Sequence, residues 1–198
     1  MSEQNEQKEK NDQTSKNKMD DEEIIEIGKL LLERIHDQHM ESNLELKRGE
    51  SYLLKEKRPL RSMDLFLKKI DEENERGYIL SRVNPKKIKE KYNLPKDKVK
   101  FYWLTSLPGK DNLKPSDLPY VAHSMIDFLE EDKGIIFMEG IETILKNNRF
   151  KEFLKFLDNL VDVVEIEEGI LITTLDPRTL PEHRLAQIER KLTVLSTS

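Results

Sequence analysis

The sequence predicts an α/β protein, a three-layer sandwich built around a five-stranded, mostly parallel sheet. Five short apolar runs alternate with amphipathic segments, a pattern typical of strands joined by crossover helices. The run at 134–139 is entered through glycine, holds four consecutive apolar residues and ends on an acidic residue. Such an unbroken run is typical of a strand buried on both faces in the middle of a parallel sheet. We therefore expect this strand to be the centre of the fold.

The composition limits the class of protein. The 198 residues are enough for one sizeable core, and the net charge of -5 argues against a general nucleic-acid binder. The absence of cysteine excludes disulfides, thiolate metal sites and a Cys nucleophile. The longest apolar run is too short for a membrane span, and the polar N-terminus does not resemble a signal peptide. We expect a cytoplasmic protein without a membrane partner.

Three regions are predicted: a disordered tail at 1–19, an amphipathic helix with its linker at 20–49, and an α/β domain at 50–198. The tail holds no apolar residue apart from methionine, so it cannot repay the entropy of ordering. The helix has one apolar face, because suitable residues recur at spacings of four, three and four. It either packs on its own domain or serves as a short coiled-coil or partner-docking helix. The residues of this face are Ile24, Gly28, Leu31 and Ile35.

Within the α/β domain, each strand is predicted to lead into a helix. Numbered along the chain, the five strands are 51–54, 77–81, 99–105, 134–139 and 169–175. We expect the sheet order 2-3-4-1-5, which places the first strand between the fourth and the fifth. Residues whose side chains can cap a helix follow four of the strands. These capping residues are Ser62, Asn84, Ser116 and Thr179.

The helices after the fourth and fifth strands are also predicted from the periodicity of their apolar residues. The most amphipathic helix is predicted from Phe150 to Val164, after the central strand, and the last helix is predicted to carry its apolar face as far as Leu195. The alternating aromatic residues Phe101 and Trp103 are interpreted as core packing on a strand, not as a base-stacking platform.

The sequence lacks the common motifs for nucleotide and acyl chemistry. A phosphate loop needs glycines so that backbone N–H groups can approach the phosphates, and the loop at 55–61 contains none. There is no G-x-G-x-x-G and no G-x-S-x-G. His36 and His39 have helical spacing but no third ligand near them in sequence, so no metal site is predicted.

Charged residues at strand ends are the candidate site. Glu139 and Glu142 could form a carboxylate pair or hold Mg²⁺, or belong to a structural network, which is the interpretation we favour. Arg82, Asp176 and Arg178 could clamp an anion or pair with Glu139, and again we favour pairing. We expect Arg82 to hold Glu139 by two parallel bonds, with Asp176 in the same cluster. The candidate ligand-binding residues are Arg82, Glu139, Glu142, Asp176 and Arg178.

Several short motifs together resemble the archaeal domain-of-unknown-function family 835, over about 51–195. They are Tyr52-Leu-Leu-Lys55, Ser81-Arg-Val-Asn-Pro85, Trp103-Leu-Thr105, Ser116-Asp-Leu118, Gly140-Ile-Glu142 with Asn147-Asn148 and Phe150, and Asp176-Pro-Arg-Thr-Leu180. The resemblance implies an archaeal cytoplasmic protein, from a family often attached to signalling and sensor modules and without an established activity. The strand pattern also looks like the core of RecA/KaiC-type ATPases. In that comparison Glu139 falls at the second acidic motif and the phosphate loop is missing.

These observations favour a non-enzymatic regulatory or protein-interaction module on a degenerate RecA-like scaffold. We expect a protein partner or self-association, and no cofactor. The alternative is a binder of a nucleotide or other small anion, held by Arg82, Arg178 and either Lys55 or Lys57. Metal-dependent hydrolysis through Glu139 and Glu142 is the third hypothesis.

Overall fold

The structure is a computed structural model that describes residues 25, 28, 45–92, 94 and 97–195. The chain divides into two compact units, Met1–Glu45 and Leu46–Ser198. The predicted tail at 1–19 lies outside the described residues. Of the predicted N-terminal helix, Ile25 and Gly28 are described, and both are helical.

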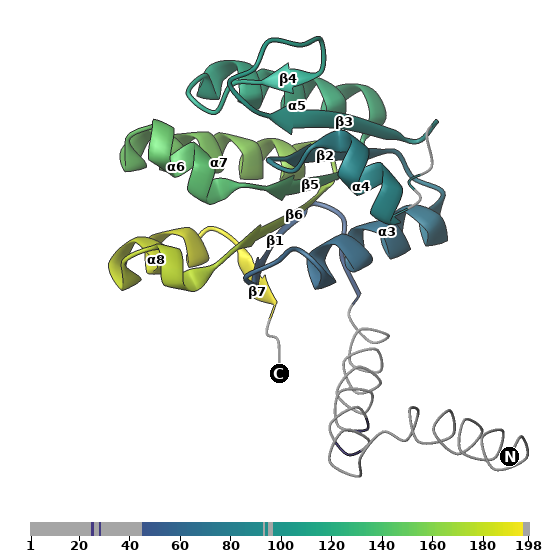
Figure 1. Ribbon diagram of the computed structural model, residues 1–198, viewed down its shortest axis with the longest axis horizontal. Coiled ribbons are helices and arrows are strands. Elements are labelled where there is room, and N and C mark those ends of the chain that lie inside the picture. The colour runs from purple at the N-terminus through teal and green to yellow at the C-terminus, as the bar shows by residue number, and fades with distance from the viewer. Residues whose placement is uncertain (1–24, 26–27, 29–44, 93, 95–96, 196–198) are drawn as a thin grey trace, which may run out of the picture. The chain divides into compact units, whose positions relative to one another are not determined.

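The second unit contains one seven-stranded sheet in the order β4-β3-β2-β5-β6-β1-β7 (Figure 1), and every strand pair in it is parallel. The predicted α/β class and parallel sheet are confirmed, and β5 is the central strand as expected. The number of strands is larger than predicted. The strands are β1 (Glu50–Lys55), β2 (Gly77–Ser81), β3 (Val99–Leu104), β4 (Asn112–Leu113), β5 (Ile135–Glu139), β6 (Ile170–Leu175) and β7 (Thr193–Leu195).

Helices cover both faces of the sheet. One core cluster joins side chains of α5, α6, α7 and α8 to one face, while α3 and α4 lie against the other face (Figure 1). In the central strand β5 every residue is buried, as is typical of a strand covered on both sides. The helices are α3 (Arg61–Glu73), α4 (Pro85–Tyr92), α5 (Leu118–Asp132), α6 (Ile141–Asn147), α7 (Phe150–Ile166), the 3₁₀ turn η1 (Pro177–Thr179) and α8 (Glu182–Glu189).

The predicted strand order 2-3-4-1-5 is wrong. In the same numbering the observed order is 3-2-4-5-1, so β2 borders β5, and β6 separates β5 from β1. Glycines at the starts of β5 and β6 give the physical reason. The N–H group of Ile170 donates to the Gly134 carbonyl (3.2 Å), and a Cβ on Gly169 would lie 3.2 Å from that same oxygen. A Cβ on Gly134 would lie 2.4 Å from the Arg76 carbonyl oxygen, just before β2. Gly134 therefore allows β5 to begin beside β2, and Gly169 allows β6 to begin beside β5.

Three of the predicted helix boundaries are also wrong. Helix α3 begins at Arg61, so Ser62 lies inside it, and α5 is capped by Asp117, whose side chain accepts from the Tyr120 N–H group. The last helix begins after Pro181 and stops at Glu189, and Thr193–Leu195, predicted to end that helix, instead joins the sheet as β7. The predicted cap at Asn84 is confirmed, since its Oδ1 accepts from the Lys86 N–H group at 2.9 Å.

Candidate functional site

The carboxyl ends of the neighbouring strands β2, β5 and β6 bring charged side chains to one edge of the sheet. Each of the five residues predicted from the sequence lies at one of these ends or in the helix or turn directly after it. We call this group, together with a serine that the sequence reasoning missed, the strand-end cluster. Its members are Ser81, Arg82, Glu139, Glu142, Asp176 and Arg178.

Glu139 is the buried centre of the strand-end cluster. It is the last residue of β5, and only 4% of its surface is exposed. One carboxylate oxygen accepts from the Ser81 hydroxyl (2.5 Å) and from the backbone N–H group of Arg82 (3.0 Å). The other oxygen accepts from Arg82 Nε at 2.8 Å. The carboxylate is therefore held by three donors, as a buried charge requires.

Arg82 pairs with Glu139 as predicted, but not through two parallel guanidinium bonds. The second bond comes from its backbone, and 59% of the Arg82 side chain remains exposed. The hydrogen bond to Glu139, and then the charge of that carboxylate, raise the pKa of the Arg82 guanidinium, with a smaller attraction from Glu142. The Arg82 carbonyl also accepts from Trp103 Nε1 at 3.0 Å, which ties the turn after β2 to β3.

Glu142 does not share the β5 surface with Glu139, because the chain turns between them. Gly140 has φ +106°, a conformation that L side chains rarely adopt, and it begins helix α6. Within α6, Glu142 accepts from the backbone N–H group of Asp176 at 2.8 Å. Glu142 therefore fixes the turn after β6, and the two glutamates are separate anchors instead of a carboxylate pair.

Asp176 and Arg178 pair with each other. Arg178 donates to both oxygens of the carboxylate, through Nε (2.9 Å) and through its terminal nitrogen (2.7 Å), and its backbone N–H group donates to the same side chain. The hydrogen bond from the Arg178 side chain is the largest cause that lowers the pKa of Asp176 to about 2. The side chain of Asp176 therefore pairs with Arg178 and not, as expected, with Arg82 and Glu139. Its backbone N–H group is held by Glu142.

A second carboxylate was missed by the sequence reasoning. Glu56 follows β1 and turns back onto the start of α3, where its oxygens accept from the backbone N–H groups of Arg61 and Ser62, both at 3.2 Å. It also accepts from the Ser62 hydroxyl. These N–H groups are the free donors that every helix start presents. The loop that follows β1 therefore places an internal anion on the N-terminus of α3.

Two further groups lie near this edge. The buried hydroxyl of Thr174 has no hydrogen-bond partner among the described residues, and Thr174 is the β6 residue paired with Glu139. Lys55, the last residue of β1, forms an ion pair with Glu189 at 3.0 Å. Two residues of this edge, Glu56 and Ser81, were missed in the sequence. The feature that could have indicated Glu56 is a glutamate between a strand and the next helix, and for Ser81 it is a hydroxyl residue at a strand end.

Within the part of the chain that the structure describes, no group of three or more His, Cys, Asp or Glu side chains is arranged to hold a metal ion. Among those same residues, no helix combines the length and the apolar character that a membrane crossing requires.

Comparisons with known proteins identify a family and a fold. The sequence profile of a family described as a protein of unknown function (DUF835) matches residues 55–192. No curated protein matches the chain. Among solved structures, it is similar to the flagellar accessory protein FlaH from Methanocaldococcus jannaschii, with 14% identity and a TM-score of 0.58 over 80% of this chain and 75% of that chain. This similarity supports a RecA-like fold.

Proposed function

We propose that this chain, which belongs to the DUF835 family, is a non-enzymatic regulatory or protein-interaction module on a degenerate RecA-like scaffold. The proposal rests on the loop between β1 and α3. In the ATPases that the strand pattern resembles, this is the position of the phosphate loop. Here the loop has no glycine, and it leads into the N-terminus of α3, whose backbone N–H groups already donate to a carboxylate of the chain.

The observation that carries the proposal is the Glu56 carboxylate on the α3 N-terminus. A helix N-terminus attracts anions because its free N–H groups and its dipole both favour negative charge. Glu56 satisfies the N–H groups of Arg61 and Ser62 from within the chain. A nucleotide phosphate would have to displace this carboxylate and would then face its repulsion at close range. The internal anion therefore disfavours phosphate binding at this helix.

The carboxylate at the end of β5, Glu139, is also already hydrogen-bonded within the chain. A carboxylate that helps hydrolysis must be free to contact a metal ion or a water molecule. Glu139 instead accepts from the Ser81 hydroxyl and from two donors of Arg82. The Glu139 carboxylate is thus engaged in holding the turn after β2, which supports a structural role for it and argues against hydrolysis.

The same edge carries a feature suited to a protein partner. Three large apolar side chains in the loops and first helical turns after strands are about half exposed: Leu60 (48%), Leu107 (57%) and Tyr120 (55%). Aromatic residues are enriched at protein interfaces, and tyrosine is among the residues that contribute most to their affinity. We propose that the partner contacts Leu107 and Tyr120, which follow the neighbouring strands β3 and β4 and which we call the apolar loop residues.

The alternative function, binding of a nucleotide or other small anion, would use cations at this edge. Arg82 and Arg178 are exposed enough to reach a ligand, but both already hold a carboxylate. Lys55 is paired with Glu189. Lys57 is exposed and lies near enough to Asp176 to help lower its pKa. An anionic ligand would therefore have to replace the carboxylates that Arg82, Arg178 and Lys55 already hold.

Thermal denaturation with a panel of nucleotides, with and without Mg²⁺, distinguishes the two functions. A ligand at 100 times its Kd should raise the free energy of unfolding by about 2.7 kcal/mol. We expect no stabilisation by any nucleotide. A stabilisation that saturates with nucleotide concentration would favour the alternative and contradict the proposed function.

Site-specific photocrosslinking in the native cell tests the interaction role. A photoreactive residue at position 107 or 120 should form a discrete protein adduct. The matched control is position 130, where Glu130 is exposed and forms no ion pair within the described residues. Adducts of equal yield at all three positions, or none at 107 and 120, would contradict the assignment of the apolar loop residues.

A further inference from the structure

The sheet has an open edge along the first part of β3. On one side β2 pairs with this strand from Val99 to Trp103, whereas on the other side β4 pairs only with Trp103 and Leu104 (Figure 1). Among the described residues, no strand lies beside 99–102 on that second side. An uncovered strand edge of this kind can pair with a further strand.

Two residues of this edge direct their backbone groups away from the sheet. The Lys98 carbonyl accepts from the N–H group at the start of β2 (2.9 Å), so Lys98 and every second residue after it face β2. The intervening residues face the other way, since the Trp103 N–H group donates to the carbonyl directly before β4 (2.8 Å). The N–H and C=O groups of Val99 and Phe101 therefore point out of the edge, where no described strand meets them.

The side chains of β3 leave room for a further strand. A lysine on a strand edge often blocks such pairing. Here the Lys100 ammonium is drawn to α5, where it pairs with Glu131 (3.2 Å) and Asp132 (3.0 Å). Because side chains alternate along a strand, Val99 and Phe101 lie on the opposite side of the sheet, and both are only partly buried. An added strand would therefore meet a neutralised lysine on one side and apolar surface on the other.

Helix α4 gives the apolar side of this edge a positive charge. It packs on β3, and four of its eight residues are lysine while one is glutamate. All four lysines are exposed, and none of them forms an ion pair within the described part of the chain. A strand beside β3 would turn every second side chain towards α4, so carboxylates at those positions would meet free ammonium groups. The lysines are Lys86, Lys87, Lys89 and Lys91.

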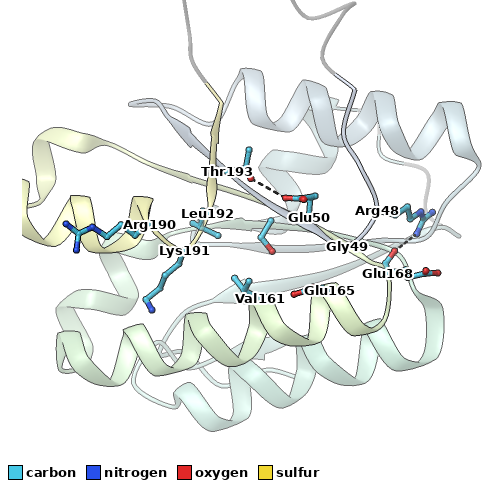
Figure 2. A pocket seen from close by; sticks show the side chains of 11 residues that line it. Arg48, Gly49, Glu50, Val161, Glu165, Glu168, Arg190, Lys191, Leu192 and Thr193 are labelled. Carbon is cyan, nitrogen blue, oxygen red and sulfur yellow. Dashed lines mark hydrogen bonds between the residues drawn. The ribbon is translucent and has the colours of Figure 1, made fainter.

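The hollow at the other edge of the sheet does not select a charge in this way. It lies beside the start of β1 and has a volume of about 540 Å³ (Figure 2). Its lining holds three cations and three carboxylates, so their charges balance. These residues are Arg48, Arg190, Lys191, Glu50, Glu165 and Glu168. The β3 edge is therefore the surface whose charge favours one kind of partner.

The open edge continues the surface of the apolar loop residues. A strand beside 99–102 would lie end to end with β4, because both would neighbour β3 on the same side. The Leu107 carbonyl accepts from Asn112 Nδ2 at 3.1 Å, which holds Leu107 beside the first residue of β4. One end of the added segment would therefore reach the loop that carries Leu107, and a single partner can contact both surfaces.

We propose that the partner of the apolar loop residues adds an extended acidic segment to the sheet as a strand beside β3. Its backbone would pair with the outward groups of Val99 and Phe101, and its carboxylates would meet the α4 lysines. A second copy of this chain is disfavoured, because antiparallel pairing of two β3 edges would bring two lysine-rich α4 helices to the same side of the joined sheet. The inference rests on the proposed function, since it gives the binding mode of the same partner.

Amide hydrogen exchange of the isolated chain tests whether the edge is open. We expect the Val99 and Phe101 amides to exchange at least about tenfold faster than those of Lys100 and Tyr102, because only the latter donate within the sheet. Equal protection of the four amides would show that the chain itself covers the edge. Protection that grows with protein concentration would show that a second copy covers it. Either result would overturn the proposal.

Photocrosslinking in the native cell, from a photoreactive residue at position 107, tests the strand pairing. Val99→Pro removes an outward N–H group and keeps the pairing with β2, which alternate residues make. We expect it to lower the yield of the protein adduct about tenfold. The matched control is Val99→Thr, which keeps the N–H group and a branched side chain and should give the wild-type yield. Thermal melts confirm that each variant is folded.

The charge of the partner is tested in the same assay. Lys86→Gln, Lys87→Gln and Lys89→Gln together should also lower the adduct yield about tenfold. The matched control makes the same change at three exposed lysines of α6 and α7, helices that pack on β6 and so lie away from the β3 edge, and should keep the wild-type yield. The control positions are Lys146, Lys151 and Lys155.

The outcomes separate this inference from the proposed function. A wild-type adduct whose yield is unchanged by Val99→Pro, or by the three α4 substitutions, overturns the strand pairing and leaves the proposed interaction in place. The absence of any adduct from position 107 contradicts both. An adduct that nuclease treatment removes would identify a nucleic acid as the partner, and it would overturn the assignment of an acidic protein segment.

Discussion

Replacing Glu139 with alanine should destabilise the fold by removing the acceptor on which the strand-end cluster depends. The change leaves the Ser81 hydroxyl, the Arg82 backbone N–H group and the Arg82 guanidinium without their shared acceptor. Ser81 is buried, with 1% of its surface exposed, so water cannot readily replace the lost carboxylate there. We therefore expect a loss of stability, without a need for any ligand.

The magnitude follows from the exposure of the two partners. Breaking a fully buried ion pair costs about 3–5 kcal/mol. Here the Arg82 side chain is 59% exposed, so its guanidinium can be hydrated once Glu139 is removed. What remains is the cost of buried donors left unpaired, about 1–3 kcal/mol. We expect Glu139→Ala to lower the free energy of unfolding by about 2 kcal/mol and Glu139→Gln, which keeps one acceptor oxygen, by about 1 kcal/mol.

Urea denaturation of both variants measures these values, provided that the slope m stays constant. Glu130→Ala is the control, since it removes an exposed glutamate and should change stability by less than about 0.5 kcal/mol. If Glu139→Ala costs no more than this control, the carboxylate is not a structural anchor. The strand-end cluster would then not contribute to the stability of the fold.

Two further predictions concern the turns that follow β5 and β6. Because the pKa of Asp176 is lowered from 3.8 to about 2 by Arg178, this carboxylate stabilises the fold above pH 3.8, and that contribution is lost as the pH falls towards 2. A pH series of melts should show a stability difference between wild type and Asp176→Asn that vanishes over this interval; a constant difference would contradict the pairing. Gly140→Ala should cost about 2 kcal/mol in chemical denaturation, because φ is +106° and the new Cβ would lie 3.1 Å from Leu104. An unchanged midpoint would mean that the turn after β5 has another conformation.

The elements that could be predicted are those with enough residues to show a period. The central strand was found because glycine precedes an unbroken apolar run, and α7 because its apolar face spans 17 residues. Strands β4 and β7 have two and three residues, which is too few to show any alternation. The strand order could not be predicted because the interior strands are similarly apolar. Its determinants include glycines 134 and 169, whose contacts appear only in three dimensions.

The candidate site was predictable where strand ends determine position. Arg82 directly follows β2, and Glu139 ends the neighbouring strand β5. Their pairing was predicted from the shared edge of a parallel sheet, although the expected order placed another strand between these two. The Asp176–Arg178 pair was missed because two residues in one tight turn satisfy each other before either reaches a neighbour. Glu56 stands in a loop crowded with charged residues, and nothing in its spacing separates it from Lys57 or Arg58.

Glu56 occupies the N-terminus of α3, where a phosphate would otherwise bind. The most direct measurement is an NMR titration of the backbone amides of Arg61 and Ser62 with ATP and Mg²⁺. Both amides already donate to Glu56, so we predict that their chemical shifts do not change as nucleotide is added. A saturable change in the shifts of these two amides would show that phosphate displaces the carboxylate and would contradict the account.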